Sequence, residues 1–134
     1  KNCVFINDSK GTSFHATKFA LKNSKNTFWI VGGLPKKNDK INLKNLKKNI
    51  IKSYIFGKNI KFFKKQIQNQ TSFKVSRTLR GSIIQVLKDI RLFRKTNNTI
   101  LFSPASASFD QFTNFEKRGE KFKELTKYYA RKFI

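Results

Sequence analysis

The chain has 134 residues, of which 38% are hydrophobic and 14% aromatic; this is enough for one folded domain with a single core and excludes a disordered polymer. No apolar run approaches the ~20 residues needed to cross a bilayer, and no signal-peptide pattern opens the chain. The low cysteine content fits a cytoplasmic setting. Cys3 is the only cysteine, which excludes a disulfide framework and a cysteine-based metal site.

The formal net charge of +23 suggests a nucleic-acid partner, but its distribution argues against one. The basic residues are mostly lysines and are spread through every segment. Recognition of phosphates and bases favours arginine, with its forked guanidinium, and basic residues that cluster on one face. We therefore expect no nucleic-acid partner. A basic Rossmann-like nucleic-acid-binding module stays as the alternative, and its affinity for a duplex would fall as a steep power of salt concentration.

Strands and helices alternate along the chain, judged from apolar spacing and from the glycines and polar clusters that separate the runs. In chain order, we predict a strand at 3–7, a helix at 14–21, a strand at 27–31, a helix at 43–51, a strand at 52–56, a helix at 59–68, a strand at 73–75, a helix at 79–93, a strand at 99–102 and a helix at 114–133. This alternation predicts an α/β fold, namely a Rossmann-like three-layer domain with a mostly parallel sheet flanked by helices.

The last helix has the clearest start signal. Thr113 is predicted to be its N-cap, and Glu116, three residues on, to reach back in a capping box. Its apolar stripe is predicted to face the core and consists of Phe115, Phe122, Leu125 and Tyr129.

The first polar segment, residues 7–13 (NDSKGTS), connects the first strand to the first helix. Thr12 or Ser13 is expected to cap that helix. Lys10 and the helix N-terminus together create a positive pocket for an anion, and Asp8 either orients Lys10 or meets polar atoms of a nucleotide. The alternative is a plain polar turn with a cap, and local chemistry leaves the choice open.

The second polar segment, residues 32–39 (GGLPKKND), follows the second strand at the same edge of the predicted sheet. Either Lys36 or Lys37 is positioned to reach a substrate carboxylate, and a turn with solvated lysines is the alternative. The chain contains no GxGxxG and no GxxxxGK[ST] motif, so it does not cradle a dinucleotide or a triphosphate by those means.

The third polar segment, residues 103–119 (SPASASFDQFTNFEKRG), follows the last strand and leads into the last helix. Small residues at the end of a parallel strand let backbone and hydroxyl groups approach a ligand closely. Ser108 is predicted to donate to a carboxylate, whereas Asp110 is expected to cap a turn and Phe112 and Phe115 to pack in the core. No carboxylate pair, nucleophile–base pair or metal-ligand spacing is recognisable, so the sequence predicts no complete catalytic set.

In this order, the segments closely resemble the C-terminal domain of the Mur ligase family, in its D-glutamate-adding branch. The matching pieces cover essentially the whole chain: FINDSKGT at 5–12, WIVGG at 29–33, YIFG at 54–57 and the third polar segment at 103–119. The chain departs from the family pattern around 34–37, which leaves open which lysine there meets substrate.

The resemblance implies that residues 1–134 form the amino-acid-binding domain of a longer, cytoplasmic ligase of peptidoglycan synthesis. Its UDP-binding and central ATPase domains would lie outside this chain. In that family, ATP activates the carboxylate of UDP-N-acetylmuramoyl-L-alanine as an acyl phosphate, which the amine of D-glutamate attacks. A sister muramyl ligase that adds another amino acid is the remaining alternative.

The resemblance also implies roles for particular residues, carried over by matching position. The residues expected to hold D-glutamate are Lys10, Thr12, Lys36, Ser108 and Phe115, and Asp8 is expected near the nucleotide. ATP and Mg²⁺ would be bound mainly by the central domain, so we expect no catalytic residue and no metal ligand in this chain. We also expect no ligation activity from this chain alone.

Overall fold

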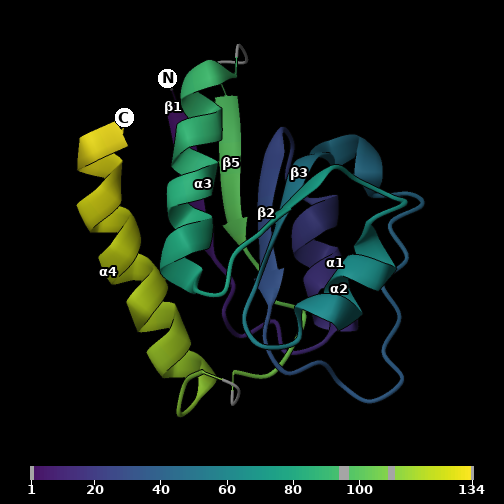
Figure 1. Cartoon of the computed structure of the whole chain (residues 1–134). Coiled ribbons are helices and arrows are strands. Elements are labelled where there is room, and N and C mark those ends of the chain that lie inside the picture. The colour runs from purple at the N-terminus through teal and green to yellow at the C-terminus, as the bar shows by residue number, and fades with distance from the viewer. Residues whose placement is uncertain (1, 94–96, 109–110, 134) are drawn as a thin grey trace.

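The computed structural model describes residues 2–93, 97–108 and 111–133, and Figure 1 shows the arrangement of their helices and strands. In chain order, the elements are β1 (Asn2–Asn7), α1 (Phe14–Lys22), β2 (Thr27–Gly32), the 3₁₀ turn η1 (Lys47–Asn49), β3 (Ile50–Phe56), α2 (Ile60–Ile67), β4 (Phe73–Val75), α3 (Leu79–Leu92), β5 (Asn97–Phe102) and α4 (Phe115–Phe133).

The five strands form one sheet in the order β1-β5-β2-β3-β4, and every pair of neighbours is parallel. The last strand in the chain, β5, is inserted between β1 and β2. Phe102 at its end is paired with Asn7 of β1 on one side and with Ile30 of β2 on the other. Because the strands are parallel, their carboxyl ends lie at one edge of the sheet. The three polar segments leave this edge from the adjacent strands β1, β5 and β2. The predicted α/β fold is confirmed.

Helices cover both faces of the sheet and make the molecule three layers thick (Figure 1). On one face, α1 and α2 bury Phe14, Leu21, Phe63 and Ile67 against strand residues such as Trp29. On the other face, α3 and α4 pack against the sheet and each other. The buried apolar side chains of these two helices are Leu79, Ile83, Val86, Leu87, Ile90, Phe122 and Leu125. Full burial of each such side chain contributes about 1.5–3 kcal/mol, so the predicted apolar stripes of the helices form the core.

The predicted helix at 43–51 is wrong, because only the short turn η1 forms there and β3 already starts at Ile50. Gln70, just after α2, holds the preceding stretch in irregular form. Its Oε1 accepts the N–H of Leu43 at 2.7 Å and its Nε2 donates to the carbonyl of Ile41 at 2.7 Å. Leu43 is fully buried all the same. The apolar spacing therefore reflects an irregular segment packed on the core, not a helical face.

The predicted N-cap of the last helix is also wrong. Asn114, not Thr113, directly precedes α4, and its Oδ1 accepts the N–H of Lys117 at 2.8 Å. At the other predicted cap, Ser13 closes α1 by accepting the N–H of Ala16 at 3.3 Å. This confirms one of the two caps predicted there and leaves Thr12 outside the capping bond.

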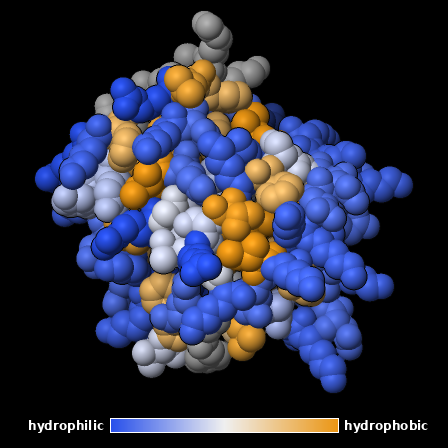
Figure 2. All heavy atoms as spheres, in the orientation of Figure 1, coloured by the Kyte–Doolittle hydropathy of each residue, from blue (hydrophilic) through white to orange (hydrophobic). Residues whose placement is uncertain are grey.

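Polar residues dominate the face of the molecule in Figure 2, where apolar side chains surface only in small groups. Among the residues that the structure describes, no helix is both long enough and apolar enough to cross a membrane.

Candidate functional site

The first and third polar segments are joined where β1 and β5 end side by side. The N–H of Asp8 donates to the carbonyl of Phe102 at 2.7 Å. The hydroxyl of Ser103, which is fully buried, donates to Asp8 Oδ2 at 2.6 Å and is also hydrogen-bonded to Thr17 Oγ1 at 2.8 Å. The Asp8 carboxylate, predicted to lie near a nucleotide, is therefore held in place from the third segment.

The second and third segments are joined in the same way beyond β2 and β5. Leu34 and Ala107 exchange two backbone hydrogen bonds of 2.8 and 2.9 Å. The buried hydroxyl of Ser106 donates to the carbonyl of Gly32 at 2.6 Å. Ser106 is thus a brace between the two segments.

Gly33 is required where these segments touch. Its φ is +131°, a backbone angle that residues with a side chain rarely adopt. A Cβ built on it would lie 2.5 Å from the carbonyl oxygen of Ala107 and 2.6 Å from Ser106 Oγ. The glycine lets the second segment lie directly on the third, three residues before Lys36.

A shallow depression of about 390 Å³ lies where the three segments meet. Two residues of the predicted D-glutamate set line it, Thr12 from the first segment and Lys36 from the second, together with Ala107 from the third. Lys37 is not among its lining residues, so the geometry favours Lys36 as the lysine that reaches a ligand here.

The other residues predicted to hold D-glutamate are not among those that line this depression. Lys10 is exposed in the same turn as Thr12. Ser108 follows Ala107 and is buried, and its carbonyl accepts the N–H of Phe112 at 2.8 Å. Phe115 is half-buried at the start of α4. The segments therefore converge as expected, while each residue's contact with D-glutamate stays a prediction.

Two residues to which sequence reasoning gave no role stabilise this edge. Asp39 accepts the N–H of Phe14 through Oδ2 at 3.0 Å, which ties the second segment to the start of α1, where a carboxylate also meets the positive end of the helix. Arg118 is fully buried beneath the first segment. The sequence gives one weak sign of this role: Arg118 is an arginine, whereas the neighbouring basic residues of the helix are lysines. The expected turn-capping role of Asp110 lies outside the described residues.

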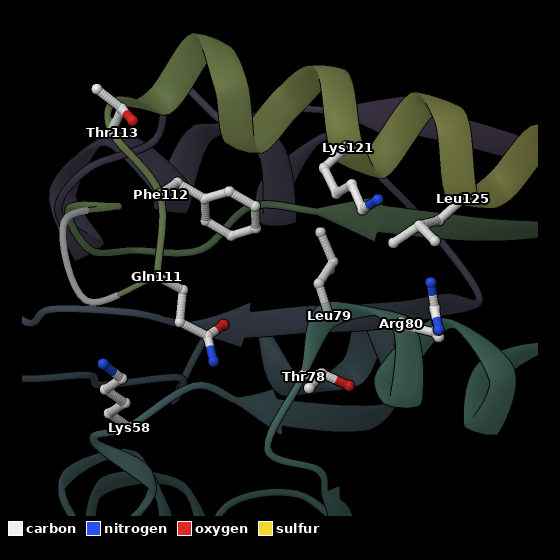
Figure 3. Close-up of a pocket in the computed structure, with 9 residues that line it drawn as sticks. All are labelled: Lys58, Thr78, Leu79, Arg80, Gln111, Phe112, Thr113, Lys121 and Leu125. Atoms are coloured by element: carbon white, nitrogen blue, oxygen red, sulfur yellow. The ribbon is translucent and has the colours of Figure 1, made fainter.

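A larger cavity of about 870 Å³ lies next to the site, between the start of α3, the third segment and α4. Figure 3 shows the ring of Phe112 pointing into it from the third segment. Basic side chains line it as well, namely Lys58, Arg80 and Lys121. It contains none of the predicted D-glutamate residues, and we assign it no ligand.

A charged cluster on the α3 side involves groups apart from the polar segments. Asp89 accepts hydrogen bonds from the Tyr54 hydroxyl at 2.6 Å and from Lys74 Nζ at 2.7 Å, and Lys52 Nζ lies 3.6 Å away. Partial burial opposes ionisation of Asp89, but these hydrogen bonds and positive charges outweigh it and hold its pKa below the usual value. Burial, reinforced by Asp89, raises the pKa of Tyr54 far above its ordinary value. The cluster stabilises the fold rather than the site.

A metal centre is not recognisable in the part of the chain that the structure describes, since no three His, Cys, Asp or Glu side chains gather there to hold an ion. The residues at hand therefore do not fit a complete Mg²⁺ site.

Comparison with known proteins agrees with the resemblance found in the polar segments, although no protein-family model matches the chain. The chain is similar to proteins named UDP-N-acetylmuramoylalanine--D-glutamate ligase. That of Nitrobacter hamburgensis is 38% identical over 126 residues, which cover 94% of this chain and 27% of that protein. That of Bradyrhizobium diazoefficiens is 40% identical over 124 residues, covering 92% and 27%. That of Bartonella henselae is 39% identical over 119 residues, covering 89% and 26%.

The chain thus spans about a quarter of the length of the curated relatives that it matches. The aligned part includes nearly all of this chain. Over nearly all of its length, the chain is thus similar to one domain-sized part of proteins named UDP-N-acetylmuramoylalanine--D-glutamate ligase.

Proposed function

We propose that this chain is the C-terminal, amino-acid-binding domain of an ATP-dependent ligase that joins D-glutamate to UDP-N-acetylmuramoyl-L-alanine in cytoplasmic peptidoglycan synthesis. The convergence of three polar segments on one depression, lined by Thr12 and Lys36 with Lys10 on the same turn, carries the proposal. The names of the relatives supply the amino acid.

The chemistry of the depression suits this ligand. D-glutamate carries two carboxylates, which bind best to ammonium groups, hydroxyls and backbone N–H donors through charge-assisted hydrogen bonds. Lys36 and Thr12 offer the first two kinds of donor. Closure of the domain over the reaction centre would exclude water and strengthen these contacts.

In this proposal the chain binds and orients the attacking amino acid, and the rest of the enzyme supplies ATP and Mg²⁺ binding and the acyl phosphate. Asp8 would lie near the nucleotide in this arrangement, and its carboxylate is held by the hydrogen bond that the Ser103 hydroxyl donates at 2.6 Å. An isolated chain should therefore be inactive when given ATP and both substrates; turnover by it would contradict this division of labour.

The test uses the intact ligase that contains this chain and a panel of amino acids. D-glutamate should be ligated at least about a hundredfold more efficiently than L-glutamate, L-lysine or glycine. L-lysine and glycine lack the side-chain carboxylate, and L-glutamate cannot place all its groups as D-glutamate does, so donors of the site stay unpaired. Such unpaired groups cost a factor of up to about 10⁴ or more in discrimination. Preference for another amino acid would point to a sister ligase and refute the assignment.

Site variants sharpen the test. Lys36→Ala should raise the KM for D-glutamate by about tenfold or more, the effect of losing one charge-assisted hydrogen bond. Lys37→Ala, one position along the same turn, is the matched control and should leave that KM within about twofold. Ser108→Ala should also raise the KM for D-glutamate or lower kcat/KM. Equal effects of Lys36→Ala and Lys37→Ala would contradict the placement of the ligand in this depression.

A further inference from the structure

Arg118 is among the largest side chains that the fold buries completely, with 0% of its surface exposed. Burying a guanidinium is expensive unless its donors are used. It comes from the first turns of α4 and lies beneath the first polar segment, so its interactions bear directly on the candidate site.

The guanidinium donates two hydrogen bonds to Ser9 of the first segment. Nε donates to Ser9 Oγ at 3.0 Å and Nη2 donates to the carbonyl of Ser9 at 2.6 Å. The hydroxyl of Ser9 in turn donates to the carbonyl of Phe115 at 2.7 Å. Ser9 is thereby hydrogen-bonded to two residues of α4, one of which is a predicted D-glutamate residue.

The same guanidinium reaches the other two segments. Its Cζ lies 5.9 Å from the ring centre of Phe102, the last residue before the third segment. Its Nη1 would be 3.2 Å from a Cβ on Gly33, so it lies directly against the backbone of the second segment. A single side chain therefore contacts the bases of all three segments that border the depression.

We infer that Arg118 is a positioning residue that orients Lys10 and fixes the start of α4 for binding of D-glutamate, an inference that rests on the proposed function. The Ser9 carbonyl and the Lys10 N–H belong to one planar peptide. A hydrogen bond to that carbonyl therefore sets the direction in which the backbone enters Lys10. A second link to α4, from Asn7 Nδ2 to the carbonyl of Gly119 at 2.9 Å, holds the start of the same turn.

Lysine cannot replace this arginine. The two donors that bind Ser9 are held in one plane by the guanidinium and approach two different acceptors of the same residue. A lysine ammonium has the charge but not the planar fork, so it cannot reproduce the paired geometry. The charge-conserving variant Arg118→Lys therefore isolates the positioning role from the charge itself.

The experiment compares three forms of the intact ligase: wild type, Arg118→Lys and Arg131→Lys. Arg131 is exposed in the last turn of the same helix and serves as the matched control. Steady-state kinetics are measured with each substrate varied in turn, and hydrogen exchange is followed by mass spectrometry in peptides that cover residues 8–13. Ser9→Ala, which keeps the arginine, is the second variant if Arg118→Lys does not fold.

In Arg118→Lys, the KM for D-glutamate should rise on the order of tenfold, since a misplacement of about 1 Å can cost up to about 10²-fold. The KM values for ATP and for the muramyl substrate should stay within about twofold of wild type. Exchange should accelerate at 8–13 and not in the strands. Ser9→Ala should shift the same two readouts in the same direction by a smaller factor, and Arg131→Lys should match wild type.

An unchanged KM for D-glutamate, with the loss confined to kcat or to the folded fraction, would overturn the inference, because a purely structural role predicts that pattern. Acceleration of exchange throughout the strands would overturn it as well. Failure of the wild-type enzyme to use D-glutamate would refute the proposed function instead. The KM for the amino acid that the panel identifies, together with exchange at 8–13, would then still decide the role of Arg118.

Discussion

Ser103→Ala tests the junction of the first and third polar segments. The mutation removes a fully buried hydroxyl that donates to the Asp8 carboxylate at 2.6 Å and is bonded to the buried Thr17 hydroxyl at 2.8 Å. A hydrogen bond to a charged group contributes about 1.5–3 kcal/mol and a neutral one about 1 kcal/mol, so the variant should lose about 2–4 kcal/mol of unfolding free energy. That is a large fraction of the roughly 5–15 kcal/mol typical of a whole domain.

The assay is urea unfolding of the chain followed by tryptophan fluorescence. Trp29 is the only tryptophan, is fully buried, and donates from Nε1 to the carbonyl of Ser103 at 2.8 Å, so it reports from the mutated junction itself. With a slope of about 1–3 kcal/mol per molar urea, the midpoint should fall by about 1–2 M. Ser72→Ala, which removes an exposed hydroxyl, is the control and should change the unfolding free energy by less than about 0.5 kcal/mol. A Ser103→Ala variant as stable as this control would refute the reasoning.

Three further predictions concern stability. Asn114→Ala should destabilise the chain by about 1 kcal/mol through loss of the α4 cap, whereas Thr113→Ala should cost less than about 0.5 kcal/mol in the same unfolding assay. Gly33→Ala should cost about 2 kcal/mol or more, because its Cβ would overlap the third segment at an unfavourable φ; a mutant with wild-type stability would contradict the geometry. Asp89 has a lowered folded-state pKa, so its contribution is present above its unfolded pKa and is lost as pH falls through the folded value. Asp89→Asn should therefore be less stable at pH 7, with a difference that shrinks below about pH 4; a difference independent of pH would contradict the ion-pair argument.

Much of the fold could be predicted because its elements obey simple periodicities. The buried stripe of α3, from Leu79 to Ile90, follows helical spacing, and the parallel strands are short apolar runs that end in glycine or polar residues. Pattern reasoning failed at 43–51, where apolar residues are spaced as in a helix but side chains of another element determine the backbone. The bonds from Gln70 that impose this shape join residues 27 and 29 positions apart, and no local pattern reveals them.

The candidate site shows the same division. Its location followed from the polar turns after three strands, because a parallel sheet brings such turns to one edge. The interactions that fix it could not be predicted, since they are tertiary. Arg118 contacts Ser9 across 109 positions of sequence. In the sequence it looks like one more basic residue of a lysine-rich helix, whereas in the structure it is fully buried.

Because β5 lies between β1 and β2, the depression can form only after residues 97–102 have joined the sheet. Residues 97–102 must pair with β1 on one side and β2 on the other before the three polar segments can meet. Occupancy of that pocket therefore favours the whole domain over its unfolded ensemble, by a free energy that grows with the logarithm of ligand concentration. A chain truncated before residue 97 would lack β5 and the third polar segment, and with them Ala107 in the lining of the depression.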